Sequence, residues 1–201
     1  MVGAGGHARV LIELCRALGG FELVGLVAQA GPPMVMGLPM LGDESRLDAL
    51  RGEGVEAACV AVGDNAARAR IGQRLLELGF ALPGLVHPSA FVASSALLGP
   101  GAVVMARAVL GTEARAEGLA ILNTGAIADH DVVLGHASHA GPGSVLAGHA
   151  RLGAGALLGA GAAVRPGVAV GAGARVGAGS AVVADVTPGL TVAGVPAKPL
   201  T

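Results

Sequence analysis

Apolar residues recur at every sixth position through the second half of the chain. Of the sixteen positions from Val92 to Val182 in steps of six, thirteen are Val or Leu and three are Ala. A second series lies four residues after each of these, from Ala96 to Val186, and thirteen of its sixteen members are Ala or Ser. No helix repeats every six residues. Glycine directly follows the aliphatic residue in eight hexads, and each such glycine would cost a helix about 1 kcal/mol.

The unbroken six-residue period of the two series predicts a three-sided parallel β-solenoid. Each hexad forms one short strand and one corner, so three hexads make a coil of 18 residues with the aliphatic residue inside and the small residue at the corner. Sixteen hexads give a little over five coils, stacked about 4.8 Å apart. A disordered low-complexity tract would not keep its phase over such a length. With 35 glycines and only three aromatic residues, the core must be built from Ala, Val and Leu.

The first 87 residues follow another rule, in which short β-like runs alternate with runs of helical spacing. Helices are expected at 7–18, 44–51 and 66–78, the last two capped by Asp43 and Asn65, and strands at 21–28, 56–62 and 82–87. The alternation predicts a small parallel sheet of the Rossmann kind. We therefore divide the chain into a Rossmann-like domain over 1–87 and a solenoid domain with a C-terminal tail over 88–201. Only Met1 and Val2 precede the first glycine turn, so we expect a longer N-terminus.

Charge and hydropathy exclude several classes of function. Thirteen basic and fourteen acidic residues give a net charge of −1, so no basic surface for nucleic acid is expected. The mean hydropathy is +0.69, but the longest stretch without a charged residue, 78–106, holds three prolines and four glycines, which a membrane helix would not tolerate. Cys15 and Cys59 lack the spacing of a metal or redox site. We expect a cytoplasmic protein with no nucleic-acid or membrane partner.

A family resemblance extends along essentially the whole chain. It is carried by three segments in this order: Gly3-Ala4-Gly5-Gly6-His7-Ala8, then Ile121-Leu122-Asn123-Thr124 running to Asp129-His130-Asp131, and the tail Ala193-Gly194-Val195-Pro196-Ala197-Lys198. Together with the hexads, they resemble the hexapeptide-repeat sugar acetyltransferases of the sialic-acid O-acetyltransferase type, which include N-acetyltransferases of nucleotide-linked amino sugars. The resemblance implies a left-handed parallel β-helix, acetyl-CoA as co-substrate, and a homotrimer with active sites between adjacent prisms.

His130 is the candidate catalytic base. It lies two residues after the inward Ala128, so its side chain should project outward at a corner, where the neighbouring Asp131 could hold the ring. A positioned imidazole that takes a proton from the nucleophile contributes typically about 10²–10⁴-fold to the rate. The resemblance makes a histidine followed by an acidic residue at this place the base and its helper. The alternative is a solvent-exposed turn histidine.

Residues 18 apart should stack in neighbouring coils, which places Gly148 about one strand spacing from His130. The Gly148 N–H could then steady a developing oxyanion, and the resemblance makes this glycine a contact to the acetyl carbonyl. An ordinary repeat glycine is the equal alternative. His139 is half a coil from His130, so both can serve one substrate only across a subunit boundary. The resemblance places His139 and Asn123 in the acetyl-CoA cleft.

The glycine turn near the N-terminus loosely fits the dinucleotide fingerprint G-x-G-x-x-A, but no acidic residue ends the strand expected next. Hydride-transfer chemistry is therefore disfavoured. The resemblance instead makes Gly5, Gly6 and His7 contacts to the nucleotide of a nucleotide-sugar substrate. It leaves UDP, GDP and dTDP open.

These observations predict an acetyl-CoA-dependent N-acetyltransferase that acts by direct attack, without a metal, on a nucleotide-linked 4-amino-4,6-dideoxyhexose. Both cysteines lie outside the solenoid, which excludes an acyl-cysteine intermediate there. Three alternatives stay open: a sugar O-acetyltransferase, a γ-class carbonic anhydrase with three histidines on zinc, and a solenoid that only binds sugar nucleotides. Two nearby γ-class ligands have four residues between them, whereas five separate His130 from His136 and two separate His136 from His139. His136 and His149 are interpreted as surface corner residues.

Overall fold

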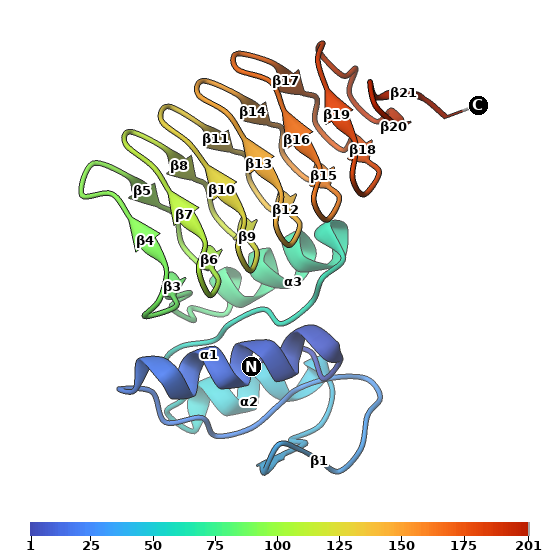
Figure 1. Ribbon diagram of the computed structural model, residues 1–201. Coiled ribbons are helices and arrows are strands. Elements are labelled where there is room, and N and C mark those ends of the chain that lie inside the picture. The colour runs from blue at the N-terminus through green and yellow to red at the C-terminus, as the bar shows by residue number, and fades with distance from the viewer. Residues whose placement is uncertain (201) are drawn as a thin grey trace.

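The computed structural model describes residues 1–200 and shows a solenoid stacked on a smaller part that contains the helices (Figure 1). The solenoid has three parallel sheets, called here its first, second and third faces, which the chain visits in turn. Neighbouring strands of a face are 18 residues apart along most of its length, as where Ala128 pairs with both Leu110 and Leu146. This register confirms the parallel β-solenoid predicted from the hexads.

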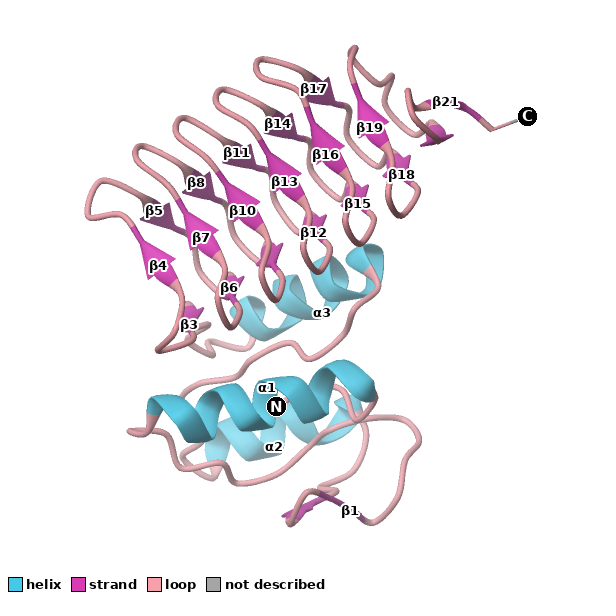
Figure 2. Ribbon diagram, viewed as in Figure 1, coloured by secondary structure: helices cyan, strands magenta, loops and turns pink. Residues whose placement is uncertain are grey.

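Almost all strands of the solenoid are two residues long, as Figure 2 shows by their short arrows. The first face consists of β4 (Phe91–Val92), β7 (Val109–Leu110), β10 (Ile127–Ala128), β13 (Val145–Leu146), β16 (Ala163–Val164) and β19 (Ala181–Val182). The second face consists of β5 (Leu97–Leu98), β8 (Arg115–Ala116), β11 (Val133–Leu134), β14 (Arg151–Leu152) and β17 (Ala169–Val170). The third face consists of β3 (Leu85–Val86), β6 (Val103–Val104), β9 (Ile121–Leu122), β12 (His139–Ala140), β15 (Leu157–Leu158), β18 (Arg175–Val176) and β20 (Thr191–Ala193), with β21 (Lys198–Pro199) added antiparallel.

The interior of the prism is filled by the two predicted series. Aliphatic residues such as Leu110 and Leu134 have no accessible surface, and the small residues between them, such as Ala108 and Ala126, are equally buried. Each fully buried Leu or Val stabilises the fold by about 1.5–3 kcal/mol relative to exposure. The core of the prism is therefore built from Ala, Val and Leu, as the composition predicted.

The solenoid has roughly six coils, not the little over five that sixteen hexads suggested. It starts one hexad earlier, since Val86 of β3 pairs with Val104. At the other end the last coil is two residues shorter, because Val170 bridges Val186 and Val176 pairs with Val192. Val186 is therefore an inward residue rather than a corner residue of the second series. The hexad phase, which assumed a constant coil length, misses this shortening.

Fourteen consecutive corners of the solenoid each contain one residue with left-handed backbone. These residues lie at intervals of six from Gly101 to Gly179, and their φ angles are between 50° and 67° except for 72° at Gly167. Glycine occupies eight of these fourteen positions, and the others are Arg107, Glu113, Leu119, Asp131, Ala137 and His149. A non-glycine residue in this conformation costs roughly 1–2 kcal/mol, so side chains occur at these corners at a cost in stability.

The N-terminal part contains α1 (Gly6–Leu18), the hairpin β1 (Met34–Val35) and β2 (Leu38–Pro39), a 3₁₀ turn (Glu44–Arg46), α2 (Leu47–Gly52) and α3 (Asn65–Glu77). The strands expected at 21–28 and 56–62 are present only as isolated parallel bridges. Across the sheet, the segment of Met40 neighbours that of Leu26 and Val27, which neighbours Val2. On its other side Val2 neighbours the segment of Ala57 and Val60, and this segment neighbours Ala81. Counted along the chain, that is the order 3-2-1-4-5 of the Rossmann arrangement. No helix within residues 1–200 is long and apolar enough to cross a membrane.

The two predicted helix caps have different outcomes. Asp43 caps its turn as expected, since its carboxylate accepts from the Ser45 amide at 2.9 Å. The Asn65 cap is wrong: Asp64 caps α3 by accepting from the Ala67 amide, also at 2.9 Å. Asn65 is thus the first helical residue, and its amide group is free to donate to Gly155 O at 2.9 Å in the solenoid.

Helix α3 lies along the corner between the second and third faces of the solenoid and is joined to it by Arg68, which is 1% exposed (Figure 1). The guanidinium donates to Leu119 O at 2.9 Å and Ala137 O at 2.7 Å on the solenoid, and to Val62 O and Gly63 O ahead of α3. Burial lowers the pKa of Arg68 to about 10, so the group stays charged at neutral pH. One buried cation satisfied by backbone carbonyls therefore connects the two parts of the chain.

Candidate active site

His130 projects from the corner between the first and second faces. Its side chain is half exposed, and its Nδ1 lies 2.9 Å from Oδ2 of Asp131. A carboxylate can only accept, so Nδ1 carries the hydrogen and the lone pair of the neutral ring is on Nε2. The hydrogen bond with Asp131, aided by the charge of Asp129, raises the pKa of His130. The same bond lowers the pKa of Asp131, which keeps the carboxylate ionised.

Gly148 lies directly beneath the His130 ring, one coil further along. A Cβ added to Gly148 would be 2.3 Å from Nε2 and 2.4 Å from Cε1 of His130. The structure thus gives a reason for glycine here that the hexad repeat does not, because any side chain would occupy the space of the imidazole. The Gly148 N–H has no backbone acceptor within the described residues, so it can donate to a group near Nε2.

His149 is a neighbour of this pair that the sequence interpretation overlooked. It is exposed at a corner, as expected, but its Nε2 lies 3.8 Å from Oδ2 of Asp131, and its ring meets that of His130 edge to face at 5.1 Å. The available signal was the coil length, since residue 149 follows residue 131 by one coil of 18. Two imidazoles therefore flank a single carboxylate at this corner.

A second polar group is formed on the third face, where the N-terminal part packs. The Asn123 amide donates to Nε2 of His139 at 2.9 Å. Burial, then the charge of Arg68 and the interaction with the neighbouring His7 ring, lowers the pKa of His139 to about 4, while a hydrogen bond to the backbone of Gly63 acts in the opposite direction. His139 is therefore a neutral ring held between Asn123 and the segment before α3.

His7 belongs to the same group. It stands in the first turn of α1, and its Nε2 is buried without a hydrogen-bond partner among the described residues. Burial, followed by the charge of Arg68, lowers the pKa of His7 to about 4. Gly5 caps α1 and Gly6 begins it, and both are exposed with open space on their Cβ side. The start of α1 thus offers accessible backbone N–H groups beside an unpaired, neutral imidazole.

The structure divides the predicted site residues between two places in one chain. His130, Asp131 and Gly148 share the corner between the first and second faces. His139 and Asn123, which the sequence analysis grouped with Gly148, instead lie on the third face near His7. The corner and the third face are opposite sides of a triangular prism. The expectation that His130 and His139 meet only across a subunit boundary stays a prediction.

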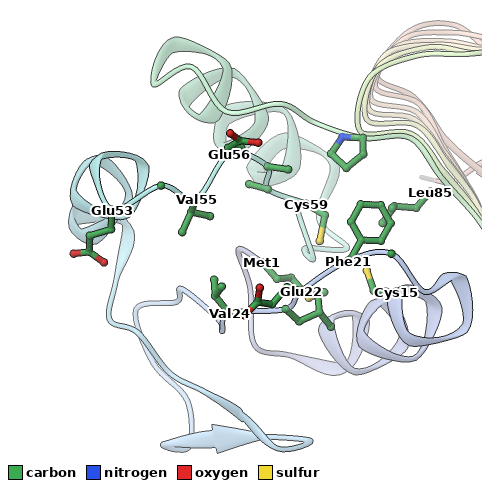
Figure 3. A pocket seen from close by; sticks show the side chains of 16 residues that line it. Met1, Cys15, Phe21, Glu22, Val24, Glu53, Val55, Glu56, Cys59 and Leu85 are labelled. Carbon is green, nitrogen blue, oxygen red and sulfur yellow. The ribbon is translucent and has the colours of Figure 1, made fainter.

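Two hollows lie outside these groups. A groove of about 450 Å³ runs between the start of α3 and the later coils of the third face, and its lining includes Asn65, His136, Gly155 and Arg175. A cavity of about 380 Å³ in the N-terminal part is lined by both cysteines, which Figure 3 shows near one end of the cavity. None of the predicted site residues lines either hollow. Cys15 is buried and Cys59 half-buried, both as free thiols.

The chain is similar to proteins of known structure over its whole length. Residues 1–75 match the family model described as the PglD N-terminal domain. The chain is 44% identical to PerB from Caulobacter crescentus in complex with CoA and GDP-perosamine, over 100% of this chain and 95% of that one, with a TM-score of 0.95. It is 41% identical to the acetyltransferase domain of PglB from Neisseria gonorrhoeae FA1090 in complex with acetyl coenzyme A, over 99% and 97% of the two chains, with a TM-score of 0.95.

A more distant structure shares the fold alone. WeeI from Acinetobacter baumannii AYE is 22% identical over 99% of this chain and 97% of that one, with a TM-score of 0.90. No curated protein matches the chain significantly.

Proposed function

Because this chain belongs to the hexapeptide-repeat sugar N-acetyltransferases and is an acetyl-CoA-dependent enzyme of amino sugars, we propose that its acceptor is a nucleotide-linked 4-amino-4,6-dideoxyhexose. The complex of PerB, 44% identical, with GDP-perosamine supports a nucleotide-linked amino sugar and puts GDP first among the nucleotides to test. The neutral state of His7 and His139 also supports an amine substrate, since neither ring adds a positive charge that would repel it.

In the proposed reaction the sugar nitrogen attacks the thioester carbonyl of acetyl-CoA while Nε2 of His130 takes one of its protons. The tetrahedral oxyanion accepts a hydrogen bond from the Gly148 N–H. Collapse then breaks the C–S bond, and the CoA sulfur takes the proton from the His130 imidazolium. The single observation that carries this assignment is the position of the His130 ring, with Nε2 unpaired over Gly148 and Nδ1 bonded to Asp131.

Asp131 has two effects in this scheme. Its hydrogen bond fixes the tautomer that leaves Nε2 free, and its charge stabilises the imidazolium that forms when the proton arrives. The raised pKa of His130 makes it a stronger base for an amine that becomes acidic only as it attacks. Below that pKa the ring is already protonated, so activity is lost as the pH falls through it.

The proposed enzyme is a homotrimer whose sites combine residues from two chains. Within one chain, His130 and the group of His7, Asn123 and His139 lie on opposite sides of the prism. An outward apolar column on the first face supports contact with a second prism: Phe91 is 61% exposed, and Ile127 and Val145 follow it at 37% and 36%. A neighbouring chain that covers this face would bring its third-face group to the His130 corner.

Thiol release from acetyl-CoA tests the substrate assignment. The purified protein is assayed with 4-amino sugars linked to GDP, UDP or dTDP and with matched sugars that carry a hydroxyl group instead. Turnover with an amino sugar, with an amide product seen by NMR, is the expected result, and the His130→Ala variant should lose it while still binding CoA. Turnover on the hydroxyl sugars alone would establish the O-acetyltransferase instead.

Mixing two inactive variants tests whether sites are shared between chains. In a refolded equal mixture of His130→Ala and His139→Ala chains, about a quarter of the sites receive both native histidines if these come from different chains. No site does so if both come from one chain. Recovery of activity near that fraction is expected. An inactive mixture that forms trimers would contradict the shared site.

A further inference from the structure

The corner that holds His130 contains a group of possible metal ligands that the proposed mechanism does not use as such. His130, Asp131 and His149 each offer one ligand atom within 4.8 Å of the other two. Two contacts within this group involve Oδ2 of Asp131, which lies 2.9 Å from Nδ1 of His130 and 3.8 Å from Nε2 of His149. All three side chains are exposed, so an ion can reach them from solvent.

The backbone holds these residues in a fixed relation. Asp131 and His149 are equivalent corner residues of consecutive coils, with φ of 58° and 61°. The His149 amide donates to His130 O at 3.0 Å, and the Asp131 amide donates to Thr112 O at 2.9 Å. The ladder therefore sets the three Cα positions, while the exposed side chains remain able to rotate about them. A site of this kind needs only small side-chain movements to close on an ion.

The donor set selects a class of ion. Two imidazole nitrogens and one carboxylate oxygen suit Zn²⁺ and related first-row ions, whereas Mg²⁺ and Ca²⁺ prefer oxygen ligands alone. Ligands at about 2.0–2.2 Å from a tetrahedral ion lie roughly 3.3–3.5 Å from one another. The observed 2.9 Å and 3.8 Å fall on either side of this spacing. Three ligands leave the fourth position of the ion to water.

We propose that His130, Asp131 and His149 bind one divalent ion of the zinc class, and that the bound ion inhibits acyl transfer. The inhibition rests on the proposed role of His130 as the base. An ion on Nδ1 takes the position of the Nδ1 hydrogen, and the proton of the neutral ring then resides on Nε2. Nε2 is the nitrogen that must receive the proton of the substrate amine. The ion therefore blocks the base without touching the substrate.

Charges around the corner are close to balanced. Glu113, Arg115 and Arg151 line the same recess of about 290 Å³ with Asp131 and His149. The two guanidinium groups oppose a cation. Glu113, one coil before Asp131, and Asp129, whose charge acts on His130, favour it. The free energy of binding must then come from direct coordination rather than from the surrounding field. Loss of one ligand should be enough to abolish it.

Co²⁺ and Zn²⁺ provide the test. The metal-free, full-length protein is titrated with Co²⁺ and followed by visible absorption, which reports a four-coordinate site, and with Zn²⁺ by calorimetry, both without substrate. We expect one ion per chain for the wild type, and no saturable binding for His149→Gln. His136→Gln, which changes a corner histidine outside this group, is the matched control and should bind as the wild type does.

Activity is measured in parallel. Zn²⁺ should inhibit the wild type and His136→Gln, and a chelator should reverse it, whereas His149→Gln should keep its metal-free turnover and resist the ion. Zn²⁺ bound by the substrate diphosphate would affect all three proteins equally, so a difference between His149→Gln and the other two reports on the protein site. Absence of binding, or equal binding by His149→Gln, overturns the metal site. Binding without inhibition overturns the tautomer argument, and the metal-free activity of His130→Ala then decides separately whether His130 is the base.

Discussion

Replacing Gly148 with Ala adds one methyl group in the space that the His130 ring occupies. The new Cβ would lie 2.3 Å from Nε2, and non-bonded carbon contacts become favourable only at about 3.5 Å. The ring must therefore retreat by roughly 1 Å, a displacement that can lower a rate by about 10²-fold. The expected fall in kcat corresponds to about 2.7 kcal/mol, and it cannot exceed the full contribution of the base, about 10²–10⁴-fold.

The same substitution should hardly affect folding. The backbone of Gly148 is outside the left-handed region, and Ala already occupies the equivalent turn position at 154, 160, 172 and 178. Gly118→Ala is the matched control. Gly118 has the same turn position in another column of corners, where its new Cβ would be 3.3 Å from Nδ1 of His136. Steady-state kinetics give kcat and the KM for acetyl-CoA, and thermal melts give stability.

The two outcomes are distinct. Gly148→Ala should lose turnover with an unchanged melting temperature and unchanged CoA affinity, and Gly118→Ala should be indistinguishable from the wild type. If kcat for Gly148→Ala stays within about threefold of the wild type, the His130 ring does not act from this position and the assignment of the base is refuted.

Three further changes test other parts of the structure. Asp131→Asn removes the main cause of the raised pKa of His130, so the acidic limb of the kcat/KM profile should move to lower pH while the plateau falls; an unmoved limb would show that another group titrates. Arg68→Met deprives five backbone carbonyls of their donor and should lower the free energy of unfolding by about 2–4 kcal/mol, seen in urea titration; a stability equal to the wild type would mean that the two parts dock by apolar contact alone. Ile127→Arg places a charge in the outward apolar column and should yield monomers in light scattering; an intact trimer would put the interface elsewhere.

The regular features of the molecule were predictable from the sequence because they depend on local repetition. Inward residues such as Leu122 and Leu134 follow from a fixed period, and the same arithmetic places Gly148 beside His130. The shortening of the last coil at Val186 was not predictable, since it breaks that period. The strands expected at 21–28 and 56–62 were predicted too long, because a hydrophobic run does not show how many of its residues form a ladder, and only isolated bridges form there.

The missed site residues depend on contacts between distant segments. Arg68 appears in the sequence as one of several charges on a helix, and only the docking of α3 on the corner between the second and third faces explains its burial. Asn65 was taken for a cap because the preceding Asp64 could not be told from it by type. His149 was within reach of the coil arithmetic, but its significance appears only once Asp131 is known to turn toward it.

The left-handed corner residues beside His130 carry a backbone cost that the glycine corners of the solenoid avoid. Glu113, Asp131 and His149 occupy three successive places in one column where glycine would relax the backbone, and the next place in the column is Gly167. At about 1 kcal/mol each, glycine at these three places would make the protein more stable by some 3 kcal/mol. Selection for thermal robustness alone would therefore erase the acidic partner of His130, and this corner is where an engineered, hardier variant should first be checked for lost turnover.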